Sequence, residues 1–179
     1  MADTYTLHVA GLTRDLPICK VNDHMDIAAF IMFSDVELTV ACAGALLKKC
    51  PEFDVILTAE AKGIPLAYEM ARQSGKQWIP ARKGPKLYMS EPVIIEDQSI
   101  TTAGKQTLVI DKKDIETMNG KRILIVDDVI STGGSLHALE TLAAKSTGTV
   151  VGRCAALAEG DASKRTDIIF LEPLPLFFH

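Results

Sequence analysis

Two adjacent aspartates, Asp127 and Asp128, end an apolar run of the sequence, and a turn rich in hydroxyls and glycines follows them. The run at 123–126 is too short for a helix and rich in branched side chains, so it predicts a buried central strand. Apolar residues from 136 to 143 recur at helical spacing, which predicts a helix beginning just after the turn. The turn itself is made of Ser131, Thr132, Gly133, Gly134 and Ser135.

A strand-to-helix turn of this composition is suited to an anion. Backbone N–H groups at the start of a helix have no partner within the helix, and together with the helix dipole they attract a phosphate. Two carboxylates beside a phosphate are electrostatically costly unless hydroxyl donors or a divalent cation offset them. A sugar phosphate with free ring hydroxyls and bound magnesium would satisfy both features. The alternative is a solvated strand end followed by an ordinary capped helix.

Two further segments could meet anions. One is a loop after a predicted strand at 54–58, with small residues that let the backbone approach a ligand, at Glu60, Ala61, Lys62 and Gly63. The other is a cationic stretch after a predicted strand at 77–81, with Arg82, Lys83 and Lys86. Arginine binds phosphate oxygens in a fork and lysine acts as a point charge. An ordinary turn and a solvated rim are the alternatives for these two segments.

The motif of an apolar strand, two acids, two apolar residues and a Thr-Gly turn resembles the type I phosphoribosyltransferases, with purine enzymes, adenine ones first, as the nearest resemblance. This resemblance implies transfer of ribose 5-phosphate from phosphoribosyl pyrophosphate to adenine, giving AMP and pyrophosphate. It implies that residues 131–135 hold the 5-phosphate, that Asp127 and Asp128 are catalytic and face the ribose hydroxyls, and that Val129 and Ile130 contact the base. Pyrophosphate would meet residues 60–63 with Arg82, Lys83 and Lys86. Mg²⁺ would arrive with the substrate, with Asp127 and Asp128 as its protein contacts.

Two departures keep other readings open. Many 6-oxopurine enzymes carry an aspartate where Ser131 stands, and adenine enzymes carry a glutamate in the lid where Thr102 stands. Ser131 argues against the 6-oxopurine enzymes, so an enzyme for hypoxanthine, guanine or xanthine is the runner-up. A third reading, from another class, is a non-catalytic sensor of phosphoribosyl pyrophosphate that regulates genes. Such regulators add a DNA-binding module or a basic surface.

The elements that must position these residues alternate between strand and helix. We predict helices at about 35–49 and 64–74 and a strand at 149–157, hence an α/β fold with a mostly parallel central sheet and helices on both faces. Ser34 and Glu37 form an apparent capping box at the first helix. Residues 1–33 are predicted to form a small hood and residues 84–106 a flexible lid hairpin, with strands at 93–95 and 108–110, in one domain spanning 1–179. Arg14, in the hood, is either a base-reading residue or a structural ion-pair residue.

Composition narrows the classes of function. The 179 residues carry a net charge of -4, which gives no basic footprint for nucleic acid, and no apolar stretch reaches membrane-spanning length. The four cysteines show no metal-ligand spacing and are expected to stay reduced. We therefore expect a cytoplasmic protein, with neither nucleic acid nor membrane as a partner. A homodimer is expected from the family resemblance alone.

Overall fold

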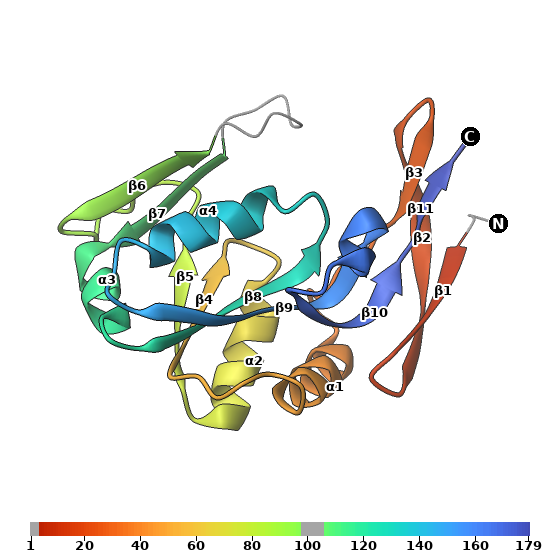
Figure 1. Cartoon of the computed structure of the whole chain (residues 1–179). Helices are drawn as coiled ribbons and strands as arrows, with labels where there is room; N and C mark the ends of the chain where they lie inside the picture. Colours follow the sequence, from red (N-terminus) through yellow and green to blue (C-terminus); the bar gives the residue numbers. More distant parts are fainter. Residues whose placement is uncertain (1–3, 98–105) are drawn as a thin grey trace.

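The centre of the protein, in a computed structural model that describes residues 4–97 and 106–179, is a five-stranded parallel sheet (Figure 1). The strand order is β10-β9-β8-β4-β5, and every neighbouring pair runs parallel. These strands are β4 (Val55–Ala59), β5 (Gln77–Ala81), β8 (Arg122–Ile130), β9 (Thr149–Glu159) and β10 (Ile169–Leu174). All five residues of β4 are buried, as expected for a strand covered on both faces.

Helices cover both faces of this sheet, which confirms the predicted α/β class (Figure 1). Alternate residues of β8 point to opposite sides, so Leu124 and Val126 join one apolar core while Ile123 and Ile125 join the other. The first core includes residues of α1 and α2, and the second includes residues of α3 and α4. The helices are α1 (Val36–Leu47), α2 (Ile64–Ser74), α3 (Lys112–Met118) and α4 (Gly134–Ala143). No helix in the described part of the chain has both the length and the apolar character needed to cross a membrane.

Several predicted boundaries agree closely with the structure. The helix at 64–74 and the strand at 77–81 have the predicted limits, and α2 ends at Gly75, whose φ of 69° is readily adopted by glycine. Strand β8 runs longer than predicted, so Asp127 and Asp128 lie within the strand rather than beyond its end. Besides the strands of the hood segment, the elements that were not predicted include α3, the 3₁₀ helix η1 (Gly160–Lys164), β10 and β11 (Leu176–Phe178).

A second sheet is built mostly from the N-terminal segment. It is antiparallel, in the order β1-β2-β3-β11, and its strands are β1 (Thr4–Val9), β2 (Leu12–Asn22), β3 (Met25–Ala28) and β11 (Leu176–Phe178). Leu7, Val9 and Leu16 pack into the same core as α1 and α2. The chain therefore leaves the large sheet at the end of β10 and completes the small sheet with β11.

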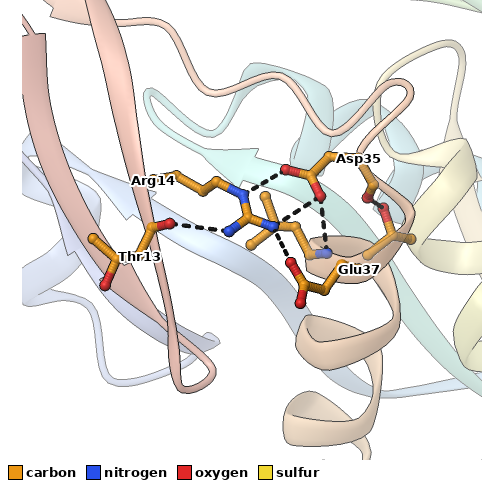
Figure 2. Close-up of polar contacts among 6 residues, drawn as sticks. Thr13, Arg14, Asp35 and Glu37 are labelled. Atoms are coloured by element: carbon orange, nitrogen blue, oxygen red, sulfur yellow. Dashed lines mark hydrogen bonds and ion pairs between the residues drawn. The ribbon is translucent and has the colours of Figure 1, made fainter.

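Arg14, on β2 of the small sheet, forms hydrogen bonds with residues at the start of α1 (Figure 2). Its Nε and Nη2 donate to the carboxylate of Asp35 at 2.7 and 3.1 Å, and Nη2 also donates to Glu37 at 2.7 Å. The predicted capping box is wrong at both positions. Asp35, not Ser34, caps α1 by accepting from the backbone N–H of Leu38 at 3.0 Å, and Glu37 is turned toward Arg14. The structure thus assigns Arg14 to an ion-pair network.

The predicted hairpin forms an antiparallel pair, β6 (Pro92–Asp97) and β7 (Gln106–Asp111). Its second strand is anchored in the core, because Leu108, Val109 and Ile110 are buried. The backbone of Val109 also exchanges hydrogen bonds of 2.7 and 2.8 Å with the backbone of Arg82, just beyond β5. The position of Thr102 lies outside the described residues, and the role of 84–106 as a lid stays a prediction.

Candidate functional site

The two aspartates occupy the carboxyl-terminal half of β8, at the edge where ligands bind to parallel sheets. Asp128 is only 3% exposed, whereas Asp127 is half-buried and accepts a hydrogen bond from the backbone N–H of Asp128 at 2.9 Å. Burial, and then the neighbouring charge of Asp128, raise the pKa of Asp127 well above its ordinary value. Two acids thus stand side by side in a setting that disfavours two bare negative charges.

The turn 131–135 has the geometry that the sequence predicted. The helix α4 begins at Gly134, directly after Gly133, whose φ of 88° favours glycine. No side chain caps the helix, so its first N–H groups face the turn. A cavity of about 270 Å³ opens there, and its walls include Asp127, Val129 and Ile130 together with the whole turn and Leu136. This space suits a phosphate attached to a sugar that reaches the acids.

The loop between β4 and α2 meets the acids from the other side. Lys62 Nζ lies 3.3 Å from Asp128 Oδ2, and the backbone of Gly63 passes so close to β8 that a Cβ there would lie 2.9 Å from Asp127 Oδ1. The same Cβ would lie 2.5 Å from Thr58 Oγ1. The peptide bond between Glu60 and Ala61 is cis. Glycine at position 63 is therefore required by close packing against the two acids.

Arg82 and Lys83, in the cationic stretch after β5, have different surroundings. The guanidinium of Arg82 donates to both carboxylate oxygens of Glu60 at 3.0 and 3.3 Å, and to the Tyr88 hydroxyl at 3.1 Å. The backbone N–H of Lys83 also donates to Glu60 at 2.9 Å. The hydrogen bond from the Lys83 backbone is the largest cause that lowers the pKa of Glu60 below its usual value, and the hydrogen bond from the Arg82 side chain is the next. Arg82 is thus bound to the loop 60–63, while the Lys83 side chain lines the large cavity described next.

One cavity of about 920 Å³ unites most of the predicted residues. The acids, the loop residues Glu60, Ala61 and Lys62, and Lys83, Val129, Ser131 and Ser135 all line it. Ile130 lines only the smaller cavity, Gly63 lies buried behind its loop, and Arg82 and Lys86 line neither space. The predicted phosphate, ribose and pyrophosphate segments therefore converge, with the cations Arg82 and Lys86 set back from the cavity.

Sequence reasoning missed several other residues that line this cavity. They include residues 27–31 at the end of β3, Leu174 at the end of β10, and the carboxylate residue Glu159 at the end of β9. Except at Glu159, nothing in the local sequence marks these residues, because they reach the cavity only through the pairing of distant strands. A weak signal was available for Glu159, an acid that ends an apolar strand next to the one bearing Asp127.

A resident metal centre is not apparent in the described residues, where no three His, Cys, Asp or Glu side chains gather as a ligand set. Asp128 Oδ2 is nevertheless a buried carboxylate oxygen that accepts no hydrogen bond within the described part of the chain. Oxygen atoms of this kind fit Mg²⁺, which usually keeps several waters and takes only one or two carboxylates. A magnesium ion with one or two protein carboxylates therefore fits these residues.

Comparisons with known proteins agree with this geometry. Residues 40–171 match the family described as "Phosphoribosyl transferase domain". An adenine phosphoribosyltransferase from Rhodococcus jostii is 33% identical over 121 residues, which is 68% of this chain and 66% of the relative. One from Thermotoga maritima is 39% identical over 100 residues, which is 56% of this chain and 55% of the relative. The match thus spans less than two thirds of the length of these curated relatives.

A solved structure gives the same result. The crystal structure of adenine phosphoribosyltransferase from Thermoanaerobacter pseudethanolicus superposes with a TM-score of 0.65 at 26% identity, covering 77% of this chain and 80% of that one. The family match covers well over half of the sequence and includes the acids, the turn and both loops that were predicted to meet anions. The chain therefore belongs to the phosphoribosyl transferase domain family.

Proposed function

We propose that this protein is a purine phosphoribosyltransferase that transfers ribose 5-phosphate from phosphoribosyl pyrophosphate to adenine, giving AMP and pyrophosphate. The observation that carries the proposal is the meeting of Asp127 and Asp128, the turn 131–135 and the loop 60–63 at one continuous cavity. The donor has a 5-phosphate, ribose hydroxyls and a pyrophosphate. The turn, the acids and the loop, in that order, match these three parts chemically. The curated relatives that carry this activity support adenine as the first base to test.

In this proposal the donor spans the two cavities. Its 5-phosphate occupies the space at the start of α4, held by backbone N–H groups and by the hydroxyls of the turn. Its ribose hydroxyls donate to Asp127 and Asp128. Its pyrophosphate lies along the loop 60–63 with Lys62 and Lys83, and Arg82 and Lys86 stand behind this loop. Asp127 and Asp128 would hold a magnesium ion bound to the donor, and that ion would supply positive charge to the leaving pyrophosphate.

The purine lies against the apolar wall of the large cavity. Val129, Leu174 and residues 27–31 all line this cavity and offer apolar surface of the kind that planar bases contact. Ile130 is buried beneath the smaller cavity, so we assign it a supporting role next to the base-binding Val129. The small sheet thereby acts as the hood that the sequence predicted.

The acids also account for the chemistry. As the bond from the sugar to pyrophosphate breaks, positive charge develops on the sugar ring. Asp127 and Asp128 are fixed beside that ring before the reaction begins, so they favour the charged transition state without reorganisation. Closure of the segment 84–106 would exclude water, which competes with the base as the nucleophile.

A panel assay tests the proposal. The purified protein is incubated with phosphoribosyl pyrophosphate, Mg²⁺ and, separately, adenine, hypoxanthine, guanine, xanthine or orotate, and pyrophosphate release and nucleotide formation are followed. We expect AMP to form fastest. Preference for a 6-oxopurine would move the assignment to the runner-up enzymes. Binding of the donor with no turnover on any base would favour the non-catalytic sensor. The expected homodimer is a proposal from the family resemblance, and light scattering tests it. The cytoplasmic location is a proposal from composition.

A further inference from the structure

Glu159 ends β9 and lines the large cavity together with both polar and apolar residues. Lys62 and Asp128, which are polar, are near enough for their charges to act on the Glu159 carboxyl. Leu174, which is apolar, is paired with Glu159 across the two neighbouring strands. In the proposed function the sugar contacts the acids and the purine contacts the apolar residues. The bond between them therefore forms close to residues of both kinds, and Glu159 has both kinds as neighbours.

The other carboxylates of the cavity already have partners. The cavity has four carboxylate residues among the described residues, namely Glu60, Asp127, Asp128 and Glu159. Glu60 accepts from Arg82 and from the backbone of Lys83, Asp127 accepts from the backbone of Asp128, and Asp128 pairs with Lys62. The carboxylate of Glu159 has no hydrogen bond or ion pair with the described side chains and backbone, so among these four residues it alone has no protein partner there.

The surroundings also make this carboxylate a better base than an exposed glutamate. Burial raises the pKa of Glu159, the positive charge of Lys62 opposes that rise, and the negative charge of Asp128 adds to it. Lys83 and Asp127 line the same cavity. On the elements packed against β9, Glu172 is exposed on β10, and Asp161 and Lys164 in η1 pair with each other.

We propose that Glu159 accepts the proton that the purine loses from its ring nitrogen when the new bond to the sugar forms. The inference rests on the proposed function. In this step the carbon–oxygen bond to pyrophosphate breaks and both electrons leave with the pyrophosphate. The lone pair of the ring nitrogen forms the carbon–nitrogen bond, and the proton on the purine passes to the Glu159 carboxylate, which becomes a neutral carboxylic acid. The proton then returns to solvent as the products depart.

Three variants test this role. Glu159→Gln keeps the size of the side chain and removes the base, Glu159→Asp keeps a carboxylate, and Glu172→Gln is the matched control on the adjacent strand. General base catalysis contributes about 10²- to 10⁴-fold, so we expect kcat with adenine to fall by about 10²-fold or more in Glu159→Gln. Glu159→Asp should recover part of this loss, and Glu172→Gln should match the wild type. The affinity for phosphoribosyl pyrophosphate should stay within about threefold in all of them.

Two readouts separate proton transfer from a structural role. The first uses 8-azaadenine, a purine analogue with a more acidic ring N–H, for which a base matters less, so Glu159→Gln should lose much less activity with it than with adenine. The second is the pH profile, since kcat/KM of the wild type should fall as acid protonates Glu159, and Glu159→Gln should lack that fall.

Equal losses with both bases, or a Glu159→Gln variant within threefold of wild type, would overturn the inference while leaving AMP formation by the wild type intact. A wild type that forms no nucleotide with any base would instead overturn the proposed function, and this inference with it.

Discussion

Lys62 Nζ lies 3.3 Å from Asp128 Oδ2, although the lysine side chain is 54% exposed and the aspartate side chain only 4%. An amine on a surface loop therefore reaches a carboxylate that solvent hardly touches. The pair links the loop 60–63 to the end of β8, so the segment proposed for pyrophosphate and the acids proposed for ribose are held in one arrangement before any ligand binds.

Replacing Lys62 should weaken the donor site more than the fold. Lys62→Met removes a charge that faces both Asp128 and the proposed pyrophosphate. A hydrogen bond to a charged group contributes about 1.5–3 kcal/mol, so we expect KM for phosphoribosyl pyrophosphate to rise roughly 10- to 100-fold. Initial rates at varied donor concentration measure this change. Lys145→Met, at an exposed position outside the cavities, is the control, and an equal KM for both variants would contradict the prediction.

Gly63→Ala tests the close approach of the loop to β8. The added Cβ would lie 2.5 Å from Thr58 Oγ1 and 2.9 Å from Asp127 Oδ1, and φ at this position is an ordinary −71°, so the effect is steric. Overpacking of this kind typically costs about 1–3 kcal/mol. We expect a lower melting temperature and a fall in kcat/KM, because the loop must move away from the acids. Gly44→Ala in α1 is the control, since its Cβ would meet only the end of the Gln73 side chain at 3.2 Å.

Asp127→Asn should separate activity from stability. Burial and the charge of Asp128 raise the pKa of Asp127, so the folded state favours the protonated carboxyl and loses stability as the pH rises through that raised value. The amide carries no charge and still offers an oxygen to the backbone of Asp128. We therefore expect the variant to melt higher than the wild type, with the difference growing from acidic to neutral pH. Thermal melts across this range measure it.

The activity of Asp127→Asn should fall even though its melting temperature rises. Loss of one preorganised electrostatic contact to the transition state typically costs about 10²- to 10³-fold in kcat, and we expect this loss for Asp127→Asn and for Asp128→Asn. The double variant should have no measurable turnover. Activity near the wild-type level in the double variant would refute the assignment of the two acids.

The cap of α1 gives a prediction on stability alone. Asp35→Ala should lower the free energy of unfolding by about 1 kcal/mol through the lost cap, whereas Asp35→Asn keeps a capping oxygen and should cost less. Ser34→Gly should cost nothing, because φ at Ser34 is 67°, which glycine adopts easily, and its hydroxyl caps no helix. Urea unfolding of the three variants compares them, and a loss in Ser34→Gly similar to that in Asp35→Ala would restore Ser34 as the cap.

The same residue gives a pH dependence. The hydrogen bond from Arg14 is the largest cause that lowers the pKa of Asp35 below its ordinary value. The charged carboxylate of Asp35 therefore stabilises the folded state at pH values above about 4, the ordinary pKa range of an aspartate. This stabilisation is lost as the pH falls through the lowered pKa of Asp35. The gap in stability between the wild type and Asp35→Asn should shrink in acid. A gap independent of pH would show that charge on Asp35 contributes nothing.

Local sequence was sufficient to predict the parts of the site that form from consecutive residues. The strand before Asp127, the turn with Gly133 and the helix after it follow from apolar spacing and backbone preferences within one short segment. The helix 64–74 followed for the same reason. The cap at Asp35 was misassigned because Ser34 and Asp35 are both capping residues, and only the distant Arg14 distinguishes them.

The other residues that line the cavity could not be predicted from local sequence. Glu159 and Leu174 meet because β9 and β10 pair, and residues 27–31 arrive from the other end of the chain. The contacts of Arg82 are likewise tertiary, since its partner Glu60 lies 22 residues away. Charge alone predicted an anion site for Arg82, and the fold gives it a carboxylate as its partner.

The small sheet joins β3, near the beginning of the chain, to β11, near residue 178. While the large sheet is still being synthesised, β3 pairs only with β2. The backbone N–H and C=O groups on its other edge have no partners until residues 176–178 have been made. Contacts between such distant segments form slowly, so the nascent N-terminal strands stay open to aggregation until residues 176–178 have been made. Changes to these residues should therefore lower the yield of soluble protein before they alter turnover.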